Sequence, residues 1–121
     1  MKYLLPEQLK TSLSLGKPIE QWLSYQKHDD YTVLKWLRID KERDAIYSVS
    51  YIECFDEGGK DFFDIYEFAP LDPNEPFIIN SFGAIDEALT FATDNYQASE
   101  SKFVSAGMIQ EEYKDYLTAR E

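Results

Sequence analysis

The middle of the chain holds strand-like runs separated by short polar linkers, and this order constrains the fold more than any other feature. The runs cover residues 31–40, 45–55 and 61–69, and residues 77–82 offer a fourth. Gly58-Gly59 lies between the second and third runs and is typical of a two-residue hairpin turn, because such turns need positive φ at both central positions. We therefore expect an antiparallel β-meander of three to four strands.

A helical pattern precedes the meander. Pro6 followed by Glu7 indicates a helix start, since proline suits the first helical position and an acid suits the first turn. Leu9 and Leu13 then fall on one side, and Gly16 ends the helix.

Further stretches also have helical spacing. Pro18 begins one, because Ile19, Trp22 and Leu23 follow at i, i+3 and i+4. Two more occupy the last third of the chain and are marked by Ile85, Ala88, Leu89, Ala92 and Tyr96, and then by Ile109, Tyr113, Tyr116 and Leu117. We expect a helix at each of the three places.

The order helix, meander, helix favours a single α+β domain over residues 1–121, with the N-terminal and C-terminal helices packed on one face of the antiparallel sheet. The core face of that sheet would hold two rows of large side chains, Trp36–Val49–Phe68 and Leu34–Tyr51–Tyr66.

A turn at Gly58-Gly59 also places Asp56 opposite Asp61 and Glu53 opposite Asp64. Directly opposed like charges destabilise a strand pair. Either the register differs from this one, or the surface is kept acidic for binding.

Negative charge is concentrated in one segment. The chain has a net charge of −11, and residues 53–75 hold eight acids and one base, Lys60, which is −8 + 1 = −7 of that total. This excess argues against nucleic acid or an anionic membrane as the ligand and favours a basic protein surface. The residues that we expect to bind this partner are Asp56, Glu57, Asp61, Asp64, Glu67, Asp72 and Glu75.

Catalytic chemistry has little support in the sequence. His28 is the only histidine, and it is most simply a loop residue between two elements. Cys54 is the only cysteine, and a small buried apolar role suits it. One histidine and one cysteine are too few for a closed zinc site. We therefore expect no enzymatic activity, no cofactor and no metal.

The N-terminal sequence predicts the compartment. The apolar run before Pro6 and Glu7 is only Leu4-Leu5, which is too short for a secretory signal. A single cysteine fits a reducing environment. We expect a cytoplasmic protein.

The second half of the chain carries a family resemblance. Residues 82–89 read FGAIDEAL, and residues 102–117 read KFVSAGMIQEEYKDYL. These stretches resemble small bacterial immunity proteins encoded beside contact-dependent growth-inhibition toxins. The resemblance implies a cytoplasmic protein that binds and neutralises one toxin domain, often a nuclease with a basic cleft, and it assigns no binding residues.

Three hypotheses follow for the function. The first is an immunity protein that covers the active or substrate-binding surface of a cognate toxin. The second is an acidic nucleic-acid mimic that inhibits a DNA- or RNA-binding protein, which predicts regular carboxylate spacing along an elongated body. The third is a small enzyme that uses His28 or a carboxylate pair, which predicts a deep pocket around those groups. The oligomeric state stays open.

Overall fold

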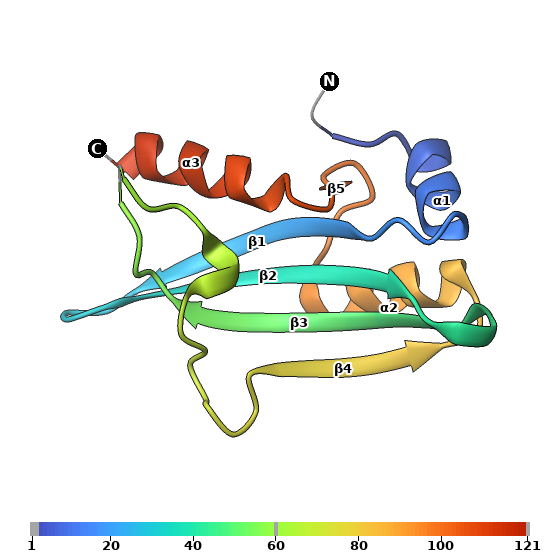
Figure 1. Ribbon diagram of the computed structural model, residues 1–121, viewed down its shortest axis with the longest axis horizontal. Coiled ribbons are helices and arrows are strands. Elements are labelled where there is room, and N and C mark those ends of the chain that lie inside the picture. Colours follow the sequence, from blue (N-terminus) through green and yellow to red (C-terminus); the bar gives the residue numbers. More distant parts are fainter. Residues whose placement is uncertain (1–2, 60, 121) are drawn as a thin grey trace.

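The computed structural model describes residues 3–59 and 61–120 (Figure 1). Its elements, in chain order, are α1 (Pro6–Ser14), β1 (Ile19–Lys27), β2 (Thr32–Lys41), the 3₁₀ turn η1 (Arg43–Ala45), β3 (Tyr47–Phe55), the 3₁₀ turn η2 (Ile65–Glu67), β4 (Phe77–Phe82), α2 (Ile85–Tyr96), β5 (Val104–Ser105) and α3 (Ile109–Arg120). The strands form one antiparallel sheet in the order β4-β3-β2-β1-β5. The α+β class and the antiparallel sheet are confirmed, and the sheet has five strands where three to four were expected.

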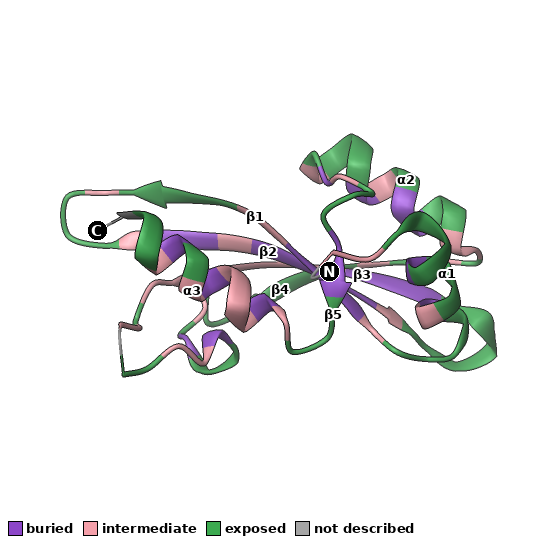
Figure 2. Cartoon of the chain, turned by 90° about the horizontal axis from the view of Figure 1, so that it is seen from above, coloured by how far each residue is buried: buried purple, intermediate pink, exposed green. Residues whose placement is uncertain are grey.

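The sheet is covered on both faces. On one face, α1 and α2 pack over a cluster that includes Leu37, Ile39 and Val49. On the other face, α3 and η2 pack over a cluster that includes Leu34 and Trp36. Figure 2 shows α2 and α3 on opposite sides of the sheet. The expectation that all helices share one face is wrong, because apolar residues on both faces of β2 need cover.

The second predicted helix is a strand. β1 runs from Ile19 to Lys27, and its register with β2 shifts between Trp22 and Ser24, so that Leu23 is an extra residue in a bulge. A bulge breaks the alternation of a strand. It therefore places Ile19, Trp22 and Leu23 at a spacing that also suits a helix.

The pairing of β2 with β3 differs from the predicted register. Leu34 pairs with Cys54 rather than with Tyr51, which is a shift of three residues. The connection between the strands covers residues 42–46 and contains Asp44 and Ala45 with φ of 58°. An odd shift moves a strand's side chains to the other face, so Val49 and Tyr51 lie on the face opposite to Trp36.

Residues 61–69 do not form the predicted third strand. Asp64 caps η2 by accepting a hydrogen bond from the Tyr66 N–H at 3.3 Å. Ile65 and Phe68 are buried three residues apart, which is one turn of such a helix rather than the alternation of a strand. β4 pairs with β3 instead, so the like-charged strand pairs Asp56–Asp61 and Glu53–Asp64 do not exist.

The other expected helices are confirmed. α1 begins at Pro6 and buries Leu9 and Leu13. α2 buries Ala88, Leu89 and Ala92. α3 buries the expected residues Ile109, Tyr113 and Tyr116.

Candidate functional site: an acidic loop beside an apolar edge strand

The acidic segment is a long loop between β3 and β4, which we call the acidic loop (residues 56–76). Backbone hydrogen bonds hold it to the end of β3: the Phe55 N–H donates to the Ala69 carbonyl at 3.0 Å, and the Leu71 N–H donates to the Glu53 carbonyl at 3.0 Å. Ile65 of this loop is buried in the same cluster as Ile109 and Tyr113 of α3. The loop therefore has a defined shape, although only η2 within it is regular.

A buried carboxylate connects η2 to the beginning of α3. Glu20 on β1 is fully buried and accepts hydrogen bonds from the Tyr66 hydroxyl, from the Gly107 N–H at 2.9 Å and from the Ile109 N–H at 3.4 Å. Arg38 Nη1 lies 3.0 Å from its Oε2 and neutralises it. The burial of the phenol and its hydrogen bond to Glu20 raise the pKa of Tyr66 above its ordinary value.

The seven predicted binding acids fall into two groups. In the first, the carboxylates accept hydrogen bonds from the protein itself. Asp56 accepts from the hydroxyls of Tyr113 and Tyr116, and Glu57 accepts from the Ala69 N–H. Asp64 belongs to the same group as the cap of η2. These contacts fix the loop.

The second group points to solvent. It consists of Asp61, Glu67, Asp72 and Glu75, all of which are exposed. Asp72 Oδ1 also accepts a local hydrogen bond from the Asn74 N–H at 3.0 Å. This group and Glu57, which is also exposed, are the acids of the loop that a partner can reach.

Four basic side chains of the described chain form ion pairs with carboxylates outside the solvent-facing group. Lys10 pairs with Asp86, Lys35 with Glu53, Arg38 with Glu20 and Asp40, and Lys114 with Glu111. Among the side chains that the structure describes, those of residues 3–59 and 61–119, no ion pair involves the solvent-facing acids of the acidic loop. Lys60, the one base of this segment, lies outside the described residues.

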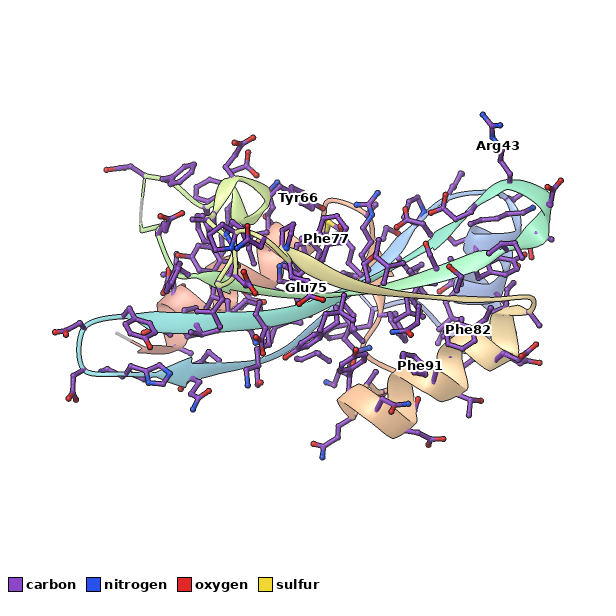
Figure 3. The ribbon with its side chains drawn as sticks, turned by 90° about the horizontal axis from the view of Figure 1, so that it is seen from below. Arg43, Tyr66, Glu75, Phe77, Phe82 and Phe91 are labelled. Atoms are coloured by element: carbon purple, nitrogen blue, oxygen red, sulfur yellow. The ribbon has the colours of Figure 1, made fainter. Side chains whose placement is uncertain are left out.

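An apolar strand adjoins these acids. β4 is an edge strand, and in Figure 1 nothing of the described chain lies beyond it except the loop that leads into it. Phe77, Ile78 and Ile79 remain 47%, 46% and 51% exposed. Figure 3 shows Glu75 and Phe77 close together where β4 begins. The acidic and apolar surfaces are therefore continuous.

A small hollow lies where the two surfaces meet. It has a volume of about 50 Å³ and is lined by Tyr51, Glu53, Leu71, Asp72, Glu75, Pro76, Phe77 and Ile78. Sites for small molecules measure roughly 300–1,000 Å³. The hollow is therefore of a size for the end of one basic side chain rather than for a substrate.

The apolar half of this surface was not among the predicted site residues. Its signal in the sequence is the run Phe77-Ile78-Ile79, which follows Pro76 without polar alternation. A strand with one wet face alternates, whereas a continuous apolar run is typical of a strand with cover on both faces. In β4 this cover is incomplete, because all three side chains of the run remain exposed.

The other candidate residues have structural surroundings. His28 stacks on Tyr31 with the ring centroids 4.6 Å apart, at the turn between β1 and β2. A hollow beside β1, of about 420 Å³, is lined by Trp22 and Lys102 among others and does not include His28. Cys54 is 2% exposed, and its burial raises the pKa of the thiol to about 12.

The described residues show neither a metal site nor a membrane-spanning helix. Among these residues, no group of three or more His, Cys, Asp or Glu side chains is arranged to hold a metal ion. In the same part of the chain, no helix has the length and apolar character needed to cross a membrane.

Known proteins provide no identity for this chain. Comparisons with protein-family models, with curated proteins and with solved structures found no match.

Proposed function

We propose that this protein is a cytoplasmic binding module that neutralises a basic protein, as immunity proteins neutralise toxins, and that it does so without chemistry of its own. The observation that carries the proposal is the group of exposed loop acids that contact no cation in the described chain. Carboxylates that are left unneutralised at one end of a protein attract a basic surface over long range and accelerate association.

The geometry adds a reason for tight contact. Charge alone gives fast but weak binding, whereas tight interfaces need an apolar centre within a polar rim. Phe77, Ile78 and Leu71 are exposed next to Asp72 and Glu75. This combination favours a protein partner over the binding of a small molecule.

The nucleic-acid mimic has weaker support. A mimic of phosphate groups needs carboxylates at regular intervals along an elongated body. Here the acids lie on an irregular loop. Four of the seven accept hydrogen bonds within the protein, namely Asp56, Glu57, Asp64 and Asp72.

The test is a matched pair of charge reversals. The double variant Asp61→Lys with Glu67→Lys changes two exposed loop acids and leaves the cap residue Asp64 in place. The control, Asp94→Lys with Glu100→Lys, makes the same change of net charge at exposed positions in and after α2. The probe that we choose is the C-terminal domain of the protein encoded immediately upstream of this gene, because the immunity proteins that the sequence resembles are encoded beside their toxins.

We expect the loop variant to bind this domain at least tenfold more weakly, because partly desolvated charge pairs cost about 2–5 kcal/mol when broken. The control should bind within about twofold, since distant exposed charges are largely screened at physiological salt. Co-expression of the protein should also restore the growth of cells that produce the domain. Equal weakening of both variants, or the absence of binding and of rescue, would overturn the proposal.

A further inference from the structure

β4 has the features of a strand that is completed by another chain. Edge strands of monomeric proteins are usually protected by charged residues, proline or a bulge. The six residues of β4, FIINSF, contain no charge and no proline, and their register with β3 is regular. We propose that a basic partner adds one of its own β-strands to the outer edge of β4. This inference rests on the proposed function, because it assigns the binding mode of that same contact.

The backbone and the side chains of β4 both suit an added strand. In an antiparallel pair, half of the N–H and C=O groups of an edge strand point away from its neighbour. Ile78 pairs with Tyr51, and Phe77 pairs with Ile52, so exposed apolar side chains occupy both faces of β4. An added strand would therefore bury apolar surface on both faces while it satisfies the outer backbone groups.

The negative charge beside β4 favours a basic strand as the one that is added. Asp72 and Glu75 are exposed beside the beginning of β4, and the small hollow next to them is walled by the same two carboxylates and by Glu53. A partner strand with Lys or Arg at its flank would place a cation among these groups. A second copy of this chain also has an open β4, but it brings a further charge of −11 against the same acids.

Two proline variants at adjacent positions of β4 distinguish a loss of strand addition from a loss of stability. Successive N–H groups of a strand point in opposite directions, so one of Ile78→Pro and Ile79→Pro removes a ladder hydrogen bond to β3, and the other removes only an outward donor. The inward variant should melt at a lower temperature. The outward variant should keep the melting temperature of the wild type within a few degrees, and both changes leave the net charge untouched.

Each variant is titrated with two probes. The first is the upstream C-terminal domain described above, and the second is a ten-residue peptide of alternating lysine and valine. We expect the outward variant to bind either probe at least tenfold more weakly. Peptide binding to the ¹⁵N-labelled wild type should slow amide hydrogen exchange at residues 77–82, and a peptide methylated at alternate backbone nitrogens should not.

The outcomes distinguish this inference from the proposed function. If the domain binds the outward proline variant normally but binds the loop charge variant weakly, the proposed function stands and strand addition is wrong. If the domain does not bind at all, the proposed function is wrong, and the peptide titration tests strand addition.

Two results with the peptide would overturn strand addition. One is slowed amide exchange outside β4, and the other is no binding at millimolar peptide. A dimer of this chain that the outward proline abolishes would assign β4 to a second copy.

Discussion

The carboxylate of Asp56, which follows the last residue of β3, accepts a hydrogen bond from the Tyr113 hydroxyl on α3, although the two residues are 57 positions apart in the chain. Tyr116, one turn further along α3, donates to the second carboxylate oxygen at 3.3 Å. The ring of Phe68, in the acidic loop, packs edge-on against the ring of Tyr113, with the ring centroids 5.2 Å apart. The Asp56–Tyr113 pair therefore joins the first residue of the acidic loop to the middle of α3.

Removal of the Tyr113 hydroxyl tests this link. Tyr113 is fully buried, and Tyr113→Phe removes its hydrogen bond to Asp56 Oδ1, which also accepts from the Gly58 N–H at 3.4 Å. We expect the free energy of unfolding to fall by about 1–3 kcal/mol in a urea titration, because hydrogen bonds to charged groups contribute more than those between neutral groups. Tyr25→Phe is the control, since Tyr25 is 52% exposed, and it should change stability by less than about 0.5 kcal/mol. Equal stabilities of the two variants would show that the link contributes nothing.

Two adjacent glycines of the acidic loop should respond differently to substitution by alanine. A Cβ at Gly58 would collide with the Phe62 carbonyl, the Tyr113 hydroxyl and the Phe68 ring, whereas a Cβ at Gly59 has open space. Gly58→Ala should therefore lower the melting temperature by several degrees, which corresponds to about 1–3 kcal/mol of overpacking. Gly59→Ala should leave the melting temperature nearly unchanged. A calorimetric scan of both variants measures the difference, and the reverse order of stabilities would contradict the packing around Gly58.

The sequence allowed prediction of the elements whose pattern is local. α1, α2 and α3 were expected because their apolar residues recur at helical spacing and because Pro6 indicates a start. β1 was missed for an equally local reason, since the bulge at Leu23 replaces alternation by a helical spacing. The run at residues 61–69 looked like a strand because it is aromatic, but the Asp64 cap and the buried residues Ile65 and Phe68 produce a single 3₁₀ turn.

Register and the candidate site depend on contacts that are distant in the chain. The offset between β2 and β3 is set by a connection in which Asp44 and Ala45 adopt positive φ, and neither residue type indicates this. Charge density located the acidic loop, but the division into acids that fix the loop and acids that face solvent depends on Tyr113 and Tyr116, far away on α3. The contribution of Phe77 appears only when β4 is known to be an edge strand.

Glu20 should be the carboxylate whose loss harms folding most. It connects β1 to Arg38, Tyr66 and the backbone before α3, and it is fully buried. Glu20→Ala leaves these donors without their acceptor, and we expect a loss of about 3–5 kcal/mol. Glu53→Ala is the control, because Glu53 is half-buried and lies 4.0 Å from Lys35, so that its ion pair is worth at most about 1 kcal/mol. Urea titrations of both variants measure the two losses, and similar losses would contradict the role of Glu20.

The buried thiol of Cys54 gives a pH dependence of known sign. Burial raises its pKa from 9.0 to about 12, so the folded protein keeps a proton that the unfolded chain has already lost above pH 9. Unfolding then releases a proton, and stability falls as the pH rises from 9 towards 12. At pH 10 the loss attributable to Cys54 should be about 1 kcal/mol, because this pH lies one unit above the pKa of the unfolded thiol.

The measurement compares the wild type with Cys54→Val in urea titrations at pH 8 and pH 10 under reducing conditions. Valine has a similar size and suits a strand, but it cannot ionise, so every other titrating group contributes equally to both proteins. We expect the wild type to lose about 1 kcal/mol more than the variant between the two pH values. Parallel losses would mean that the thiol ionises as readily in the folded protein as in the unfolded chain, which its 2% exposure opposes.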